Sequence, residues 1–264
     1  MSTSTFPVVQ PGRPIIQALP VDPPAKVEAP APVEVAEVEE EIPAVRPSMF
    51  DLVLRRPRLL DRVLRDERSI PKAIQDLVSL SVIGFSVYGL VVGASAQLVH
   101  DRLGWNSFFT HGTPAVWTPL SFVLAFLGAI GICLPSFYFF TQLSGLDASF
   151  RSVTAQALRG AATTAVLLLG AAPFYGAWVL GNVVGVFSDV RFTLQIGMVL
   201  PFIIGLFGVG AVERAFRSMV EVVPITHRRR GNFVRRMVMA WGALFTAIAP
   251  VALYRLGEWF GSWL

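Results

Sequence analysis

The chain has 264 residues, of which 53% are hydrophobic and 15% carry a charge. Soluble domains contain about 25% charged residues, so this composition excludes a soluble globular protein and favours a chain embedded in lipid. The net charge of +4 does not indicate a nucleic-acid-binding protein, because the basic residues flank apolar segments and do not gather in a basic soluble domain.

Residues 1–48 are predicted to form a disordered, proline-rich tail. The tail holds three basic and seven acidic residues, which gives it a net charge of −4. Its segment PPAKVEAPAPVEVAEVEEEIP has no aromatic residue and cannot bury a core. Two interpretations remain open: a solvated spacer, or a docking segment for a basic partner.

Residues 49–72 predict an amphipathic, basic helix. Pro57 suits the first turn of a helix, and after it leucines such as Leu60 and Leu64 recur at helical spacing. We expect this helix to lie in the headgroup layer of the membrane; the alternative is that it packs on a partner. The residues expected to contact anionic lipid headgroups or a partner are Arg58, Arg62 and Arg65.

Five apolar segments follow within residues 73–264. Each reaches the roughly 20 residues that an α-helix needs to cross a hydrocarbon core of about 30 Å. Polar and apolar residues do not alternate in them, which excludes a membrane β-barrel. The sequence therefore predicts an all-α, polytopic membrane helix bundle with five transmembrane helices. Their predicted ranges are residues 74–99, 116–143, 161–183, 192–212 and 237–256.

Basic residues in the connecting segments predict the orientation. Outside the tail itself, sixteen Lys and Arg residues fall on the same side as the N-terminal tail and three on the other side. The positive-inside rule then places the N-terminus in the cytoplasm and the C-terminus outside, and we expect a bacterial inner membrane. Tryptophans mark the predicted outer interface, and they are Trp105, Trp117, Trp178, Trp259 and Trp263.

Glycine pairs at four-residue spacing predict close helix packing, because a missing side chain lets two helix backbones approach. One pair is Gly89 with Gly93, and another is Gly181 with Gly185. We expect these faces to pack inside the bundle, or alternatively between copies in a homo-oligomer.

Prolines inside the predicted spans indicate kinks, because proline lacks the N–H that an interior helix position donates. The candidate kink sites are Pro135, Pro173 and Pro201. Broken helices form midplane binding sites in many transporters. However, no charged residue lies near the middle of a predicted span, and ion-coupled sites usually need one.

The sequence predicts neither an enzyme nor a cofactor or metal site. Zinc-protease, nucleophile-elbow and phosphate-loop motifs are missing, and the three histidines are scattered among the connecting segments. The basic segment 213–236 favours contact with anionic lipid headgroups or with a protein partner, unless it serves only to fix the topology. Its candidate contact residues are Arg228, Arg229, Arg230, Arg235 and Arg236.

The strings LLDRVLRDERSIPKAI, VYGLVVGA, GICLPSFYFFTQLSG and LLLGAAPFYG resemble bacterial five-span membrane proteins of unknown function, which are similar in outline to the Yip-type family. This resemblance covers a little under half of the chain, from Leu59 to Phe174. It implies five spans after a cytoplasmic tail and a scaffold or membrane-organising role. The acidic-Leu-Tyr-Gly-Pro segment of the eukaryotic members is missing, so binding to Rab GTPases does not carry over.

We therefore expect a non-enzymatic integral membrane scaffold or partner-recruiting protein. Its expected contacts are the lipid bilayer, anionic headgroups and a protein partner, and no nucleic acid. One alternative is a small-solute permease or channel built on proline-kinked helices. Another is a membrane subunit of a larger complex.

Overall fold

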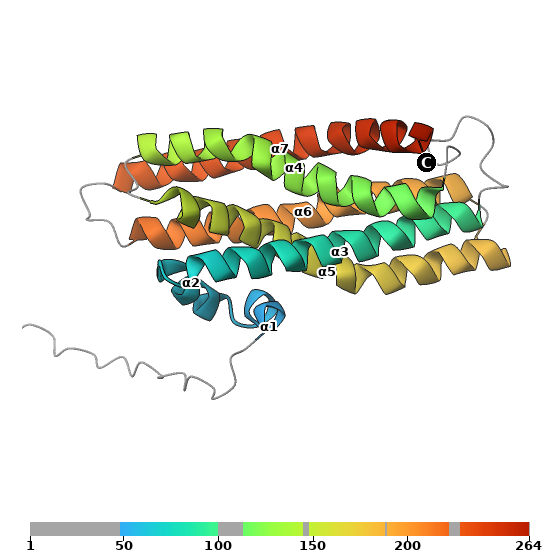
Figure 1. The fold of residues 1–264 in the computed structure, drawn as a ribbon, viewed down its shortest axis with the longest axis horizontal. Coiled ribbons are helices and arrows are strands. Elements are labelled where there is room, and N and C mark those ends of the chain that lie inside the picture. Colours follow the sequence, from blue (N-terminus) through green and yellow to red (C-terminus); the bar gives the residue numbers. More distant parts are fainter. Residues whose placement is uncertain (1–47, 100–112, 145–147, 188, 222–227, 264) are drawn as a thin grey trace, which may run out of the picture. The chain divides into compact units, whose positions relative to one another are not determined.

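The computed structural model describes residues 48–99, 113–144, 148–187, 189–221 and 228–263, all within one compact unit of residues 45–264 (Figure 1). The predicted tail lies outside the described residues, apart from Ser48. Two short helices, α1 (Met49–Leu54) and α2 (Pro57–Arg65), come first. Five long helices follow, and they are α3 (Ile70–Leu98), α4 (Pro114–Leu143), α5 (Phe150–Val184), α6 (Val190–Glu221) and α7 (Arg228–Trp263).

All five long helices are long and apolar enough to cross a membrane. The prediction of an all-α bundle with five membrane-spanning helices is therefore confirmed. The segment 49–72, predicted as one helix, instead forms α1, α2 and the first turn of α3. Pro57 explains the first break, because a residue before proline is pushed away from helical geometry, and Arg56 has φ −127° and ψ 58°.

The helix α5 begins at Phe150, well before the predicted start of its span at residue 161. The Ser149 side chain stabilises this start, since its Oγ accepts a hydrogen bond from the Ser152 backbone N–H at 3.2 Å. As a result, Arg151 and Arg159 belong to the helix itself. Arg159 therefore needs a partner within the folded chain.

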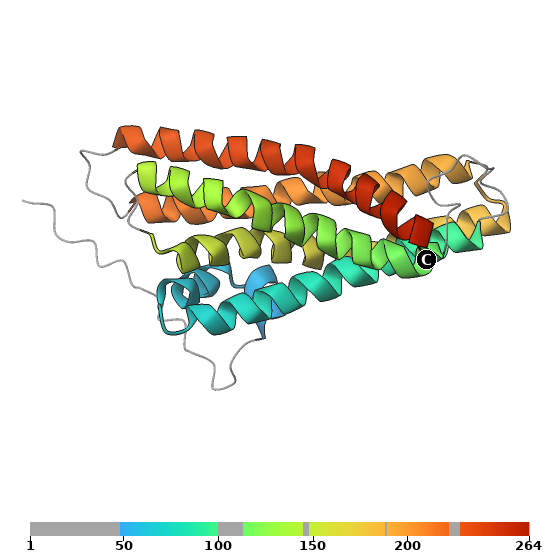
Figure 2. The same cartoon turned by 45° about the horizontal axis from the view of Figure 1, so that its top comes forward.

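Contacts between the five long helices close into a ring. Helix α3 packs against α4 and α5, α5 also packs against α6, α6 against α7, and α7 against α4. Figures 1 and 2 show the long helices running side by side along one axis. Successive long helices are antiparallel, so the start of α3, the end of α4, the start of α5, the end of α6 and the start of α7 share one end.

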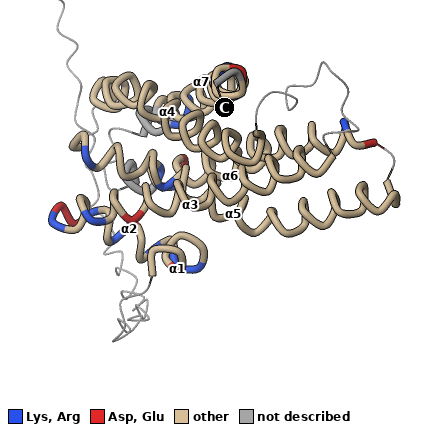
Figure 3. The backbone as a smooth tube through the Cα atoms, turned by 45° about the vertical axis from the view of Figure 1, so that its right-hand side comes forward, with Lys and Arg blue, Asp and Glu red and all other residues tan. Residues whose placement is uncertain are grey.

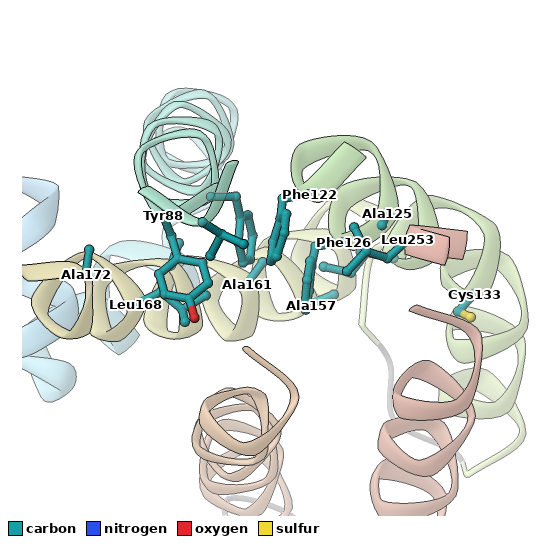
Figure 4. Close-up of a cluster of buried hydrophobic side chains, with 14 of the residues drawn as sticks. Tyr88, Phe122, Ala125, Phe126, Cys133, Ala157, Ala161, Leu168, Ala172 and Leu253 are labelled. Carbon is teal, nitrogen blue, oxygen red and sulfur yellow. The ribbon is translucent and has the colours of Figure 1, made fainter. Parts of the chain in front are cut away.

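Aromatic side chains fill the middle of this ring. The ring of Phe126 in α4 lies 4.7 Å from that of Phe85 in α3, 5.5 Å from that of Phe202 in α6 and 6.0 Å from that of Phe245 in α7, measured between centroids. Aromatic pairs at such distances contribute about 0.5–1.5 kcal/mol each beyond their buried area. Figure 4 shows Phe126 beside Ala157, so the small residues of α5 make room for the aromatic cluster.

Small residues set the spacing of the neighbouring helices. A Cβ added at Gly84 in α3 would lie 2.8 Å from the Cβ of Ala165 in α5, and one added at Gly89 would lie 2.7 Å from the Cα of Pro119 in α4. Both values are below normal contact distance, so these helices touch through their backbones, as membrane helices with small faces do. In the predicted pair Gly89 and Gly93, both glycines face α4 of the same chain.

We predict that Gly89→Ala destabilises the bundle, because its methyl group would meet the backbone of Pro119, which cannot move aside cheaply. Overpacking of this kind costs about 1–3 kcal/mol. The midpoint of thermal unfolding in neutral detergent measures the effect. Gly131→Ala on the exposed side of α4 is the matched control, since nothing lies within 4 Å of its added Cβ. Equal midpoints for the two variants would contradict this packing.

Candidate functional site

The helices α1 and α2 lie on the bundle at its basic end. Leu60 and Leu64 of α2 are fully buried, and they belong to one apolar cluster with Leu77 of α3 and Leu158 of α5. The apolar face of α2 is therefore covered by the chain's own transmembrane helices. This burial explains why a helix of nine residues persists, since so short a helix is marginal without tertiary packing.

An ion pair fixes the rotation of α2 on the bundle. The Arg159 guanidinium donates a hydrogen bond through Nη1 to Asp61 Oδ1 of α2, and its Nη2 lies 3.5 Å from the carbonyl oxygen of Pro57. The side chain of Arg159 is only 7% exposed. A buried guanidinium is stable only when it is paired, so the long helix α5 requires α2 in this position.

The opposite face of α2 carries a stripe of arginines. Since Leu60 and Leu64 face the bundle, the arginines at i, i+4 and i+7 on the other side of α2 are exposed. None of them pairs with an acidic side chain among the described residues. The residues of this stripe are Arg58, Arg62 and Arg65, which the sequence predicts to contact anionic lipid headgroups or a partner.

The ends of α6 and α7 form a second basic surface. Glu213 of α6 pairs with Arg217 one turn further on at 2.8 Å and with Arg235 of α7 at 3.2 Å, so it joins the two helices. Arg214 and Arg236 are exposed, and the Nε of Arg214 donates to the Gly210 carbonyl at 3.2 Å. The predicted contact residues Arg228, Arg229 and Arg230 form the first turn of α7, and their side chains lie outside the described part.

The two basic surfaces share one end of the bundle, because α2 precedes the start of α3 while α6 ends and α7 begins there. Figure 3 shows most of the described Lys and Arg residues at this end. At the opposite end, the exposed cations Arg191 and Arg255 are accompanied by Asp189 and Glu258, and Arg255 pairs with Glu258 at 3.1 Å. The described chain is thus strongly asymmetric in charge along the bundle axis.

Three of the described tryptophans lie toward the end opposite to the basic surfaces, whereas Trp241 lies in the interior. Trp178 of α5 and Trp259 of α7 are exposed there, whereas Trp117 of α4 is buried. Trp105 and the side chain of Trp263 fall outside the described part. Exposed indoles are typical of the boundary between hydrocarbon and water.

The interior holds a hydrogen bond that depends on a proline. Pro201 of α6 has no N–H, so the Gly197 carbonyl one turn earlier loses its usual helical donor. The hydroxyl of Tyr88 in α3 donates to this carbonyl at 2.7 Å. Tyr175 of α5 lies beside Tyr88, with ring centroids 6.1 Å apart, but its buried hydroxyl has no partner among the described residues.

The predicted kink prolines do not meet at a common site. Pro201 is buried, whereas Pro135 and Pro173 are exposed on the outer surface of the bundle. Each lies inside a helix that continues on both sides of it.

A cavity of about 20 Å³ lies where all five long helices meet. It holds roughly one water molecule, and its described lining includes no ionisable side chain. The helices contribute, in chain order, Phe85, Phe126, Thr164, Gly208 and Trp241 to it, among other residues.

The second predicted glycine pair has a different role from helix packing. Gly185 caps the end of α5 in the left-handed conformation, with φ 90°. Its N–H donates to the Asn182 carbonyl and that of Val186 to the Gly181 carbonyl, which is a Schellman cap. The Phe187 ring covers Gly181, so this part of the pair serves the turn into α6.

Comparison with known proteins finds no matching family model, no matching curated protein and no matching solved structure. The resemblance to Yip-type proteins therefore stays a prediction. No group of three or more His, Cys, Asp or Glu side chains that could hold a metal ion occurs among the described residues.

We predict that Tyr88→Phe destabilises the bundle by about 1 kcal/mol, because it leaves the Gly197 carbonyl buried without a donor. Tyr175→Phe is the matched control, since its hydroxyl has no described partner, and it should leave the unfolding midpoint unchanged or slightly raised. Thermal unfolding in detergent compares the two variants. A larger loss for Tyr175→Phe would show that the wrong tyrosine has been assigned to the bond.

We also predict that Asp61→Asn releases α2 from the bundle, because Arg159 then keeps a buried, unpaired charge. Removing one partner of such a pair costs about 3 kcal/mol. Trypsin cleavage at the α2 arginines measures the release and should become faster. Glu258→Gln breaks an exposed pair instead and should leave the cleavage rate unchanged. The double variant D61N/R159Q should recover part of the protection; if it does not, the ion pair is not what holds α2.

Proposed function

We propose that this chain is a non-enzymatic membrane scaffold that recruits a protein partner through its basic end. The observation that carries the proposal is the asymmetry of charge described above: arginines gather at one end of a bundle whose interior is filled by aromatic side chains. The positive-inside rule assigns that end to the cytoplasm, and a bacterial inner membrane fits this orientation.

The packing of the interior supports a scaffold over a permease. A solute path needs a polar site near the bilayer midplane, and ionisable groups commonly provide it. The cavity where the five long helices meet is the size of one water molecule, and Phe85, Phe126 and Phe245 line it. The carbonyl freed by Pro201 is already bonded to Tyr88, so it offers no open ligand position.

The α6–α7 basic surface, defined as Arg214, Arg217, Arg235 and Arg236, is the recruiting surface in this proposal. Arg217 and Arg235 are engaged with Glu213, which fixes the helix ends relative to each other. Arg214 and Arg236 keep guanidinium N–H groups directed to solvent, and such groups bind carboxylates in bidentate fashion. The favoured partner therefore presents an acidic surface, and the chain then serves as the membrane subunit of a larger complex.

We predict that R214Q/R236Q weakens capture of the partner about tenfold or more, because a charge-assisted hydrogen bond contributes about 1.5–3 kcal/mol and 1.4 kcal/mol equals a factor of ten. The measurement is affinity capture of the full chain after cross-linking in intact cells. R191Q/R255Q removes two arginines at the opposite end and is the matched control. Equal capture by both double variants would contradict recruitment through this surface.

The same protein in liposomes tests the permease alternative. The scaffold proposal expects no solute flux above that of empty liposomes. Flux that Pro201→Ala changes would overturn it, because that result would place a solute path beside the proline in α6.

A further inference from the structure

We propose that the α1–α2 segment is a binding site for the phosphate group of an anionic membrane lipid. This inference goes beyond the proposed recruiting function, because it concerns α2 and not the α6–α7 basic surface. It rests on three observations about the described residues: a free arginine stripe, the level of α2 along the bundle, and exposed apolar side chains next to it.

The arginines of the stripe form no ion pair among the described residues. Asp61 is the acidic residue of α2, and it is turned inward to Arg159. Asp51 of α1 pairs with Arg55 and Arg56 at 3.8 Å, so it does not neutralise the stripe. Three guanidinium groups on one helix face therefore remain free to bind, and each one presents N–H donors that match two phosphate oxygens. These groups belong to Arg58, Arg62 and Arg65.

The depth of α2 relative to the membrane interface can be worked out from its contact with α5. Trp178 and Arg159 are 19 residues apart in one helix, which corresponds to about 29 Å at 1.5 Å per residue. This length equals the thickness of a hydrocarbon core, about 30 Å. With the exposed Trp178 at one interface, Arg159 lies at the other, and α2 is held there by Asp61. The stripe is thus at the depth of the lipid phosphates.

Exposed apolar side chains distinguish a lipid from a water-soluble acidic partner. Phe50 and Leu54 of α1 are 45% and 50% exposed, and α1 packs on α3 and α5. At the edge of the hydrocarbon core, these side chains enter the acyl chains, whereas a water-soluble surface gains nothing from exposing them. A helix pair with apolar side chains beside arginines is typical of an element that lies in a membrane interface.

The experiment measures binding of phosphatidylglycerol to the purified full chain in neutral detergent by native mass spectrometry, with phosphatidylcholine as the neutral lipid. We expect the chain to retain phosphatidylglycerol in preference to phosphatidylcholine. The triple variant R58Q/R62Q/R65Q should bind it about a hundredfold more weakly, because each arginine near an anionic headgroup contributes about fivefold.

The control variant R151Q/R191Q/R255Q removes the same charge from exposed positions on α5, α6 and α7, and it should bind phosphatidylglycerol as the native chain does. Equal weakening by the two triple variants would overturn the proposal, because binding would then follow net charge alone. Competition by inorganic phosphate at similar concentration would also overturn it in favour of a free-anion site, and competition by a phosphorylated peptide in favour of a protein partner.

Unfolding midpoints in detergent without added lipid check that the triple variant is folded, which is expected because all three side chains are exposed. If it does not fold, Arg62→Gln alone replaces it and should weaken binding about fivefold; unchanged binding by that variant would contradict the proposal. Because R214Q/R236Q tests recruitment and leaves α2 intact, either proposal can fail without the other.

Discussion

Close contact between helix backbones is the constraint on which the rest of this structure depends. Inside a bilayer, an apolar side chain gains nothing by leaving its surroundings, so helices associate through packing and hydrogen bonds. Gly84 against Ala165 and Gly89 against Pro119 bring α3 next to both α5 and α4, and Gly160 against Gly208 does the same for α5 and α6. These contacts close the ring around Phe126, and the ring in turn fixes which helix ends come together.

The buried arginine follows from that arrangement. The close packing of α5 against α3 extends to the first turns of α5, where Arg159 would otherwise face lipid headgroups and acyl chains unpaired. Asp61 of α2 neutralises it, and Leu60 and Leu64 close the apolar surface around the pair. The rotation of α2 that buries Leu60 and Leu64 also exposes the arginine stripe, and the Asp61–Arg159 pair helps to hold this rotation.

Sequence patterns predicted the parts of the fold that depend on local composition. The five apolar segments, and the excess of arginine on one side of them, can be identified from the sequence because a 20-residue span and its flanking charges are local features. The start of α5 was missed since Arg151 and Arg159 interrupt the apolar run, although the helix continues through them. Asp61 lies 98 residues before Arg159 and Tyr88 lies 109 before Gly197, so neither pairing has a local signal. The sequence Gly181 to Gly185 matched a packing motif, but the apolar residues after it, Val186 and Phe187, fit a helix cap equally well.

A proline inside a membrane helix can serve a solute-binding site or the packing of helices, depending on what binds the carbonyl that the proline leaves without a donor. In transporters, an unbonded carbonyl lines a cavity and coordinates the solute. Here the Gly197 carbonyl, which Pro201 leaves without a helical donor, accepts a hydrogen bond from the Tyr88 hydroxyl in α3. This hydrogen bond connects α6 to α3. The hydrogen bond that the proline removes from one helix is replaced by one between two helices. The proline thereby contributes to the packing of the bundle, and this contact is one reason for proposing a scaffold in preference to a permease.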